Sequence, residues 1–473
     1  MYFRFIPVVF VSATLLSACV GTTPPLETTD VPGAWQAPLA GEAQIWPDTA
    51  WWTGFQNEEL NSLITQVQAN NFDLANNQRN LEAAQLTLRE AGFALLPTPS
   101  VTIGTGARYS RTDGDTGSVE DSGGDPFSLN AGLNYTGILS KPATYERAVA
   151  DYEGRVAQAA DLALNTLGTA ASTYFQLLLT RDRVVAAQQN LANAEAIGII
   201  AQARVDAGVA VPIEALQQQI AIERERANLR SLAQSDLSTR ASLALLVGRN
   251  VQGFDMSGQT LDALSVPQVQ PGLPSELLRR RPDLVQSEAS LRSANANLTV
   301  VRTALFPQIN LTGNASAASL SLTELVTSPD SALTVSATLV QTLLDNGQRF
   351  RNIDQAKLSL ETSLANYRRA VLGALNEVEV LLSNIQLLEQ QGQVALRNLE
   401  AAEESFRIAE LRYQEGLSDY QTMLQSQNTL FSTRNSWLDS KLQQLNARIS
   451  LFQALGGGWQ ADTDPLLSLS QAP

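Results

Sequence analysis

Four short segments of the chain alternate apolar residues with Asn, Gln, Ser, Thr or Gly. Alternation with a period of two residues predicts a β-strand that has one apolar and one polar face. Such strands suit the wall of a transmembrane barrel, with lipid outside and water inside, but they also suit a half-buried sheet of a soluble protein. The predicted strands cover about residues 99–110, 126–136, 307–318 and 331–341, and the first shows the weakest alternation.

The segments that join the predicted strands in pairs are polar. Residues 112–125 are dominated by Gly, Asp and Ser, which predicts a loop, and residues 319–330 take the same place in the second pair. Four strands are too few for a closed barrel, because the smallest transmembrane barrels use about eight. Since an open sheet edge cannot lie in hydrocarbon, a barrel made from these strands requires several copies of the chain.

Two long segments, 142–207 and 348–415, predict helices because neither contains a proline after its first turn. A helix of about 65 residues reaches roughly 100 Å. Ala, Gln and Asn dilute its apolar stripe, so the pattern fits either a solid coiled coil or a helix with one face on water. The stripes contain Leu164, Leu167, Ala171, Tyr174 and Leu178 in the first helix and Val371, Leu375, Val378, Leu382 and Ile385 in the second.

The chain contains a long internal repeat. Residues 203–248 align without gaps on residues 411–456, a shift of 208 residues, and a shift of 210 aligns Asp73 with Asp283 further upstream. Gly208 and Gly416 end the two long helices, because glycine readily takes the left-handed conformation found just past a helix end. We therefore predict two helical hairpins, with tips near 208–212 and 416–419, at the end of the molecule furthest from the strands.

Charge and residue content narrow the function. The formal net charge is −15, which argues against nucleic acid as a partner. The chain has no histidine, the commonest general base and metal ligand. A single cysteine, Cys19, excludes a disulfide within the chain and thiolate metal clusters. We therefore predict no enzymatic activity, no metal site and no cofactor.

The N-terminus indicates export. Arg4 precedes an apolar run, 5–16, that is too short to span a bilayer comfortably and so reads as a signal peptide. The sequence Leu16-Ser17-Ala18-Cys19 resembles a bacterial lipobox, which implies cleavage before Cys19 and lipidation of that residue. An ordinary cleavage site beside an incidental cysteine is the alternative. No later segment offers about 18 uninterrupted apolar residues, so no membrane-spanning helix is predicted.

These observations divide the chain into six parts. Each repeat is predicted to contain a helix, two strands, a long helix, a tight turn and a returning helix. The parts are a signal peptide at 1–18, a lipidated N-terminal segment at 19–56, repeat 1 at 57–248, a connector at 249–275, repeat 2 at 276–458 and a C-terminal tail at 459–473.

Motifs from nearly the whole mature chain carry a family resemblance. They are Trp51-Trp52-Thr53-Gly54-Phe55, Leu277 to Leu284 with its three arginines, Ala304-Leu305-Phe306-Pro307, Arg412-Tyr413, Asp419-Tyr420 and Ala454 to Trp459. Together they resemble the TolC-like outer-membrane factor family, and in particular its lipoprotein branch, called NodT-type.

The resemblance implies a homotrimer that joins a twelve-stranded transmembrane β-barrel to a twelve-helix periplasmic coiled-coil tunnel, with the connector in a belt around its equator. The implied function is a passive exit duct for small toxic compounds, drugs or metals. The resemblance implies that an inner-membrane pump of the RND type and a periplasmic adaptor hand them over. The implied location is the outer membrane, with lipid on Cys19 as anchor. A type I protein-secretion channel and a non-conducting lipid-anchored periplasmic scaffold remain as alternatives.

The resemblance also implies a gate at the hairpin tips. In relatives an Arg–Tyr pair and carboxylates of the second hairpin hold the tip closed, and Arg412 and Tyr413 match that pair. Arg412 could instead satisfy carbonyl groups at its own helix end. Asp419 is a candidate carboxylate, or else a solvated turn residue. Gln425 stands where relatives often carry an aspartate, which weakens the expectation of an acidic ring.

We predict that Cys19→Ser abolishes incorporation of a labelled fatty acid, because serine lacks the thiol that is acylated. A β-barrel holds in the membrane without a lipid, so part of the variant should still sediment with outer membranes. Membrane fractionation checks this. Complete loss of membrane association would argue against the barrel.

Overall fold

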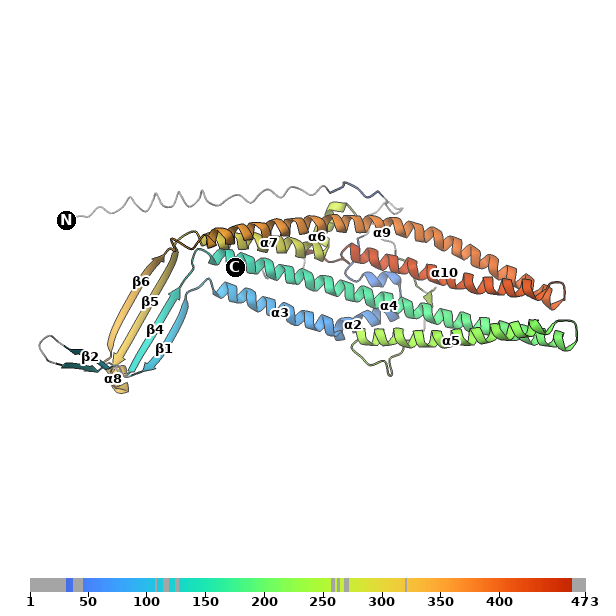
Figure 1. Ribbon diagram of the computed structural model, residues 1–473, viewed down its shortest axis with the longest axis horizontal. Helices are drawn as coiled ribbons and strands as arrows, with labels where there is room; N and C mark the ends of the chain where they lie inside the picture. The colour runs from blue at the N-terminus through green and yellow to red at the C-terminus, as the bar shows by residue number, and fades with distance from the viewer. Residues whose placement is uncertain are drawn as a thin grey trace.

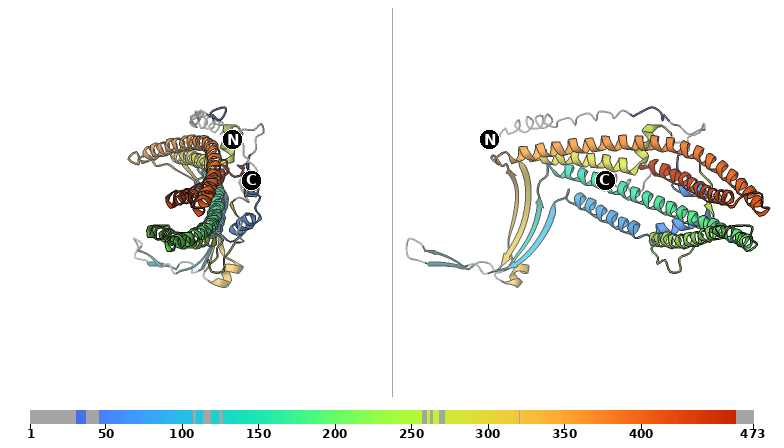
Figure 2. Two further views of the ribbon diagram at one scale, coloured as in Figure 1. Left: turned by 90° about the vertical axis from the view of Figure 1, so that its right-hand side faces the viewer. Right: turned by 45° about the vertical axis from the view of Figure 1, so that its right-hand side comes forward.

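The structure is a computed structural model that describes residues 31–36, 46–106, 109–113, 119–123, 127–256, 260–261, 264–267, 272–319 and 321–461. Long helices run side by side along most of its length, and a β-sheet stands at one end (Figure 1). The two long helical hairpins reach their tips at the opposite end (Figures 1 and 2). Cys19 and the predicted signal peptide and lipobox lie outside the described residues.

Four strands form one antiparallel sheet in the order β1-β4-β5-β6. The strands are β1 (Thr98–Thr105), β4 (Phe127–Tyr135), β5 (Gln308–Ser319) and β6 (Asp330–Val340). Each repeat thus supplies two neighbouring strands, and the two pairs meet where β4 pairs with β5. Strands β1 and β6 are the sheet's two edges, and neither has a second partner within the described residues.

The register of the sheet gathers its apolar residues on one face. Ile103 pairs with Leu129, which pairs with Ala317, and Gly313 pairs with both Leu133 and Val335. The intervening positions bring Thr, Asn, Ser and Gly together on the other face. The apolar side chains stay open to the surroundings in the single chain: Ile103 is 74% exposed and Val335 is 79% exposed. A lipid-facing surface has this pattern.

Two predicted loops contain regular structure. Strands β2 (Tyr109–Asp113) and β3 (Val119–Gly123) form a separate antiparallel hairpin that begins at the end of the predicted first strand and continues through the predicted loop at 112–125. The sequence there is polar at nearly every position, so no alternation in hydropathy marks the strands. In the second unit, a short helix, α8 (Leu322–Thr327), begins where the Ser321 hydroxyl accepts a hydrogen bond from the Glu324 N–H (3.2 Å). That cap is a local signal present in the sequence.

The helices confirm the predicted fold class of two repeats around long hairpins. The short helix η1 (Trp51–Phe55) lies in the N-terminal segment, and η3 (Pro274–Glu276) lies at the boundary between the connector and repeat 2. In repeat 1 the helices are α2 (Glu58–Asn70), α3 (Phe72–Phe93), α4 (Lys141–Asp206) and α5 (Pro212–Leu246); in repeat 2 they are α6 (Leu277–Arg280), α7 (Pro282–Thr303), α9 (Gln348–Gln414) and α10 (Tyr420–Ala454). All ten residues of the two predicted apolar stripes are buried. Within the described chain, only α9 has a stretch apolar enough to cross a membrane, which is weak support for a span because core helices share that property.

The sequence repeat is also a repeat of contacts. Arg226 pairs with Glu195 at 2.9 Å in repeat 1, and Arg434, 208 residues later, pairs with Glu403 at 2.9 Å in repeat 2. Where the upstream helix meets the end of the returning helix, Asn71 Nδ2 donates to the Leu246 carbonyl (2.9 Å) and the aligned Arg281 donates to the Ala454 carbonyl (3.0 Å). The two repeats therefore build the same joints, even where the side chains differ.

An aromatic cluster forms the core where the upstream helices end. Phe55 is fully buried, and its ring centroid lies 5.0 Å from that of Phe175 and 6.1 Å from that of Phe452. The Trp51 ring stacks on Phe452 at 5.3 Å. Tyr174 donates to Glu59 (2.8 Å), and its burial, followed by that carboxylate, raises the pKa of the phenol far above its usual range. This core joins the N-terminal helices to both hairpins.

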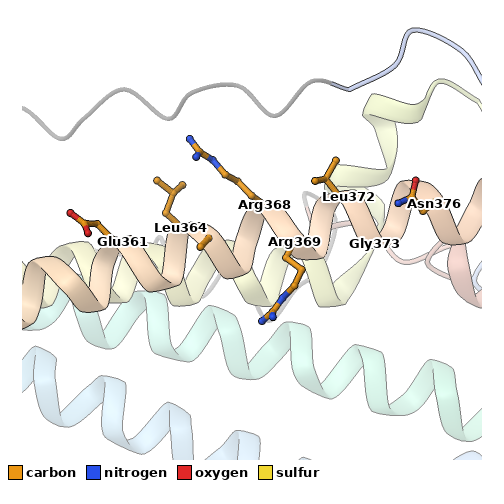
Figure 3. Close-up of a pocket in the computed structure, with 8 residues that line it drawn as sticks. Glu361, Leu364, Arg368, Arg369, Leu372, Gly373 and Asn376 are labelled. Atoms are coloured by element: carbon orange, nitrogen blue, oxygen red, sulfur yellow. The ribbon is translucent and has the colours of Figure 1, made fainter.

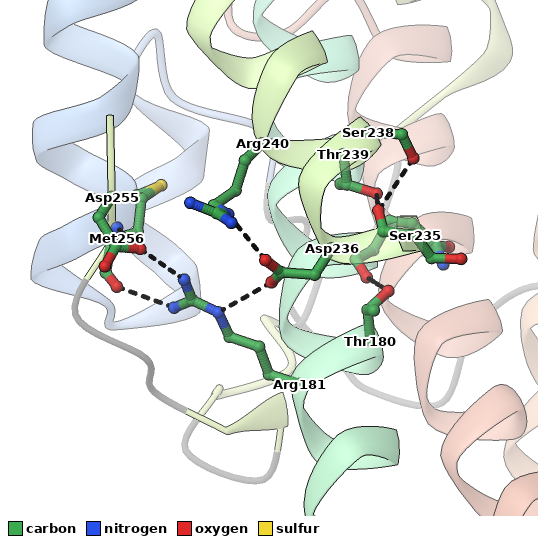
Figure 4. Close-up of polar contacts among 10 residues, drawn as sticks. Thr180, Arg181, Ser235, Asp236, Ser238, Thr239, Arg240, Asp255 and Met256 are labelled. Carbon is green, nitrogen blue, oxygen red and sulfur yellow. Dashed lines mark hydrogen bonds and ion pairs between the residues drawn. The ribbon is translucent and has the colours of Figure 1, made fainter. Parts of the chain in front are cut away.

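The connector is tied to repeat 1 by an ion-pair network (Figure 4). Arg181 on α4 donates to the Met256 carbonyl (2.8 Å) and pairs with Asp255 (2.9 Å) and with Asp236 on α5 (3.5 Å). Arg240 completes the network by pairing with Asp236 at 2.7 Å. A hydrogen bond from the Met256 N–H is the main cause that lowers the pKa of Asp255. The Asp255 carboxylate therefore stays ionised at neutral pH and holds the connector against the hairpin.

We predict that Phe55→Ala destabilises the folded protein by about 3–5 kcal/mol, because it empties a fully buried aromatic site. Denaturant unfolding followed by tryptophan fluorescence checks this. Phe93→Ala is the matched control, since Phe93 is 73% exposed and should lose little stability. Equal losses in the two variants would contradict the assignment of the core.

Candidate gate at the hairpin tips

Both hairpins turn through the same backbone motif. Gly208 and Gly416 have φ angles of 72° and 73°, in the left-handed region that favours glycine. In repeat 2 the Gly416 N–H donates to the Tyr413 carbonyl (3.1 Å) and the Leu417 N–H donates to the Arg412 carbonyl (2.7 Å). The same pair of bonds closes the turn after α4. These bonds satisfy carbonyl groups that the helix end would leave unpaired.

Arg412 and Tyr413, both of which the sequence analysis assigned to the gate, have side chains in different environments. Arg412 is exposed, and its guanidinium donates to the Leu417 carbonyl of its own turn (3.4 Å). Tyr413 is 1% exposed and points into an apolar cluster that includes Ile197 of the other hairpin. Adjacent positions on a helix lie about 100° apart, so one residue can face the core while its neighbour faces solvent.

Tyr413 lies at the contact between the two hairpins. The Arg204 guanidinium of α4 lies over its ring at 4.9 Å, and Arg204 also donates to the Tyr413 carbonyl (3.3 Å). The Tyr413 hydroxyl donates to the Glu214 carboxylate of α5 (3.4 Å). Burial, followed by the charge of Glu214, raises the pKa of Tyr413, so the hydroxyl keeps its proton at neutral pH. Each of these contacts crosses from repeat 1 to repeat 2.

A second tyrosine extends the contact. The Tyr420 ring packs edge-on against Tyr413 at 5.9 Å, and its hydroxyl donates to the buried Gln218 amide oxygen (2.8 Å). The Gln218 amide nitrogen donates in turn to the Ala194 carbonyl of α4 (2.8 Å). Burial raises the pKa of Tyr420 to about 12. The chain of hydrogen bonds thus leaves both atoms of the Gln218 amide satisfied.

The remaining candidates lie at the surface. The Asp419 carboxylate accepts from the Thr422 N–H (2.7 Å) as the N-cap of α10, and this bond is the main cause that lowers its pKa. Gln425 is exposed one turn further along α10. Asp419 is therefore ionised at neutral pH, but its contact in the single chain is with its own helix.

Sequence reasoning missed Arg204, Glu214 and Gln218, which form the repeat-1 half of the contact. Arg204 aligns with Arg412 in the internal repeat, and that alignment was the available signal. Nothing in the sequence indicated which of the two arginines reaches the other hairpin. Among the described residues, no group of three or more His, Cys, Asp or Glu side chains could hold a metal ion.

This architecture defines a class: a membrane channel whose chain contributes part of a β-barrel wall and two long helical hairpins. The chain belongs to the outer membrane efflux protein family, whose model matches residues 63–249 and 273–457. It is an outer-membrane efflux channel.

Similar proteins agree over the full length. The chain is 33% identical over 467 residues to the pyoverdine export outer membrane protein OpmQ of Pseudomonas putida, covering 95% of this chain and 96% of that protein. It is 27% identical over 429 residues to the cation efflux system protein CusC of Escherichia coli, covering 89% and 91%. The fold superposes on the outer-membrane channel OprN with a TM-score of 0.84 at 22% identity, covering 92% and 98%. It superposes on the open state of the Neisseria gonorrhoeae MtrE channel with a TM-score of 0.79 at 25% identity, covering 92% and 98%.

We predict that Arg204→Ala raises single-channel conductance by shifting the tip toward an open state. Losing a cation–ring contact of about 1 kcal/mol would change the balance between closed and open tips about fivefold. Arg412→Ala is the matched control, because Arg412 contacts only its own turn among the described residues. Planar-bilayer recordings check this. A larger effect of Arg412→Ala would place the gate between neighbouring chains instead.

Proposed function

We propose that the chain assembles as a homotrimer and forms the passive exit duct of a tripartite efflux system. The observation that carries the proposal is the four-stranded sheet with two unpaired edges and one continuous apolar face. Three sheets of four strands make a closed barrel of twelve. Closure supplies hydrogen-bond partners for the outer edges of β1 and β6, which have none among the described residues of one chain and which the hydrocarbon of a membrane cannot supply.

The strand directions support closure by repetition. Neighbouring strands within the sheet are all antiparallel, so β1 and β6, at positions one and four, run in opposite directions. Pairing β6 of one copy with β1 of the next continues the antiparallel order around the ring. No extra strand or change of direction is needed, as expected for the even-stranded barrels of bacterial outer membranes.

The hairpin tips are the proposed entrance of the duct. They lie at the end furthest from the sheet, so they reach into the periplasm when the sheet lies in the outer membrane (Figure 1). We propose that a periplasmic adaptor engages the tips and opens the contact around Tyr413, and that an inner-membrane pump of the RND type delivers the solute. The contact consists of one cation–ring contact and a few hydrogen bonds around two buried tyrosines, each worth about 1 kcal/mol, so a binding partner can offset their loss.

The transported solutes are proposed to be small toxic compounds, drugs or metals. OpmQ is a pyoverdine export protein and CusC belongs to a cation efflux system, so related chains serve chemically different solutes. A duct that performs no chemistry fits the sequence, which has no histidine. A lipid on Cys19 would add an anchor beside the barrel, with no other cofactor.

Cross-linking tests the barrel directly. Thr102→Cys on β1 and Ser336→Cys on β6, in a lipidated chain without another free thiol, should give covalent trimers with a flexible bis-maleimide. The purified trimer should also conduct ions in a planar bilayer. The control pair, Ser128→Cys on β4 and Ser316→Cys on β5, lies within one sheet and should link within single chains. Monomers that neither cross-link nor conduct would favour a periplasmic scaffold.

A further inference from the structure

The helices α4 and α9 align position by position in the repeat but differ in how much of their surface is covered. One stripe is buried in both helices, as Leu167 and Leu375 show. A second stripe is buried only in α4. There Leu164 and Gly168 are buried, whereas the aligned Leu372 is 49% exposed and Asn376 is exposed. The difference shows that α4 has a cover within the chain that α9 lacks.

The open stripe of α9 forms a groove. Its lining includes Glu361, Leu364, Leu372, Gly373 and Asn376. Figure 3 shows Arg368 and Arg369 leaving the same turn of the helix toward opposite sides of this groove. A Cβ atom placed on Gly373 would meet nothing within 4 Å. A second groove continues the stripe toward the tip along α9 and α10.

The end of α10 and the turn after it cover the equivalent face of α4. Gln453 Nε2 donates to Asn165 Oδ1 (3.3 Å), and a Cβ atom on Gly168 would lie 2.2 Å from Gln453 Nε2. A Cβ atom on Gly457 would lie 2.2 Å from Leu164 Cδ1. Repeat 2 therefore packs its returning helix and the following turn closely onto the long helix of repeat 1.

The equivalent segments of repeat 1, at the end of α5 and the start of α3, do not cover α9 within the described chain. The counterpart of Gln453 is Leu245 at the end of α5, which is 69% exposed. The start of α3 is attached to this end through the bond from Asn71 to the Leu246 carbonyl, as α7 is attached to α10 through Arg281. Phe72 at that start is 63% exposed. An apolar cover and an open groove thus occur on one chain, and neither has a partner among the residues that the structure describes.

The charges at the two joints are exchanged. In the covered joint, Asp161 of α4 lies in the field of Arg281 and Asp283 at the start of α7; burial and Asp283 raise its pKa, and Arg281 opposes them. In the repeat, Arg369 replaces Asp161, Asn71 replaces Arg281, and Asp73 replaces Asp283. The long helix α9 therefore carries a cation, Arg369, where α4 carries an anion. The helix that would cover α9, which is α3, keeps an anion at the position of Asp283 in the form of Asp73.

We propose that the groove on α9 receives a second copy of this chain, whose end of α5 and start of α3 fill it, with Arg369 paired to Asp73 of that second copy. The inference rests on the proposed trimer and names the residues that join its subunits. Both side chains are exposed in the single chain, where Arg369 donates to Asn366 on its own helix (2.7 Å). Neither side chain must leave a buried partner to form the pair.

The exchange of charged residues between the two joints also distinguishes the joint within a chain from the joint between chains. If the second copy's α3 approached α4 instead, Asp73 would meet Asp161, and two carboxylates would repel. If α7 approached the groove on α9, Arg281 would meet Arg369. Like charges at a joint disfavour the wrong pairing, so the repeats alternate around the ring.

Charge reversal tests the pair. Arg369→Asp and Asp73→Arg should each lower the fraction of trimer on dilution in detergent, by about tenfold in the association constant, because three joints change at once. The double variant Arg369→Asp with Asp73→Arg should restore assembly. The matched control is Arg407→Asp, since Arg407 is an exposed arginine of α9 that pairs with Glu404 on the same helix (2.7 Å).

Cross-linking supplies a second readout that does not depend on the strength of the pair. Asp73→Cys with Arg369→Cys should link separate chains, and Asp73→Cys with Arg407→Cys should not. Stable trimers that show neither rescue nor this cross-link would overturn the inference and leave the channel proposal standing. Absence of trimers in the unmodified protein would remove both.

Discussion

Backbone hydrogen bonding inside a membrane is the constraint on which the rest of this structure depends. A sheet of four strands leaves two edges, β1 and β6, and hydrocarbon offers their N–H and C=O groups no partner. The register already places the apolar side chains on one face and the polar side chains on the other. In the proposed assembly the sheet is a segment of a barrel wall, and the helices are arranged so that several copies can close around one axis.

The internal duplication gives the molecule two versions of its helix joints, and at some of them the two versions have diverged in charge. At the equator, repeat 1 uses Arg181 with Asp236 and Arg240 to hold the connector. The aligned residues of repeat 2 are Glu389, Gln444 and Arg448, and there Arg448 pairs with Glu389 across α9 and α10. Aligned helix positions thus hold the connector in repeat 1, whereas in repeat 2 they join α9 to α10.

The two hairpin tips also differ in side chains that lie on a shared backbone. The two turns have the same backbone, but their side chains interlock unequally: repeat 2 supplies two tyrosines, and repeat 1 supplies the arginine, carboxylate and amide that receive them. The tyrosines stay protonated over the physiological range, because burial raises the pKa of both. Their contribution is present below the usual tyrosine pKa and is lost only as the pH rises through the raised value, so these hydroxyls do not lose their protons and open the tip near neutral pH.

The sequence by itself determined the elements and their order. The signals were local: period-two alternation, apolar stripes without proline, and the glycines at 208 and 416. Such signals predict structure from sequence because they depend only on residues close together in the chain. The duplication, and the need for several copies, followed from the same patterns. Only the tertiary structure decided that Tyr413 is buried while Arg412 is exposed, and that Arg204 lies over the Tyr413 ring. Aligned residues of a repeat carry the same local signal, and their roles diverge only through the neighbours that folding brings to each.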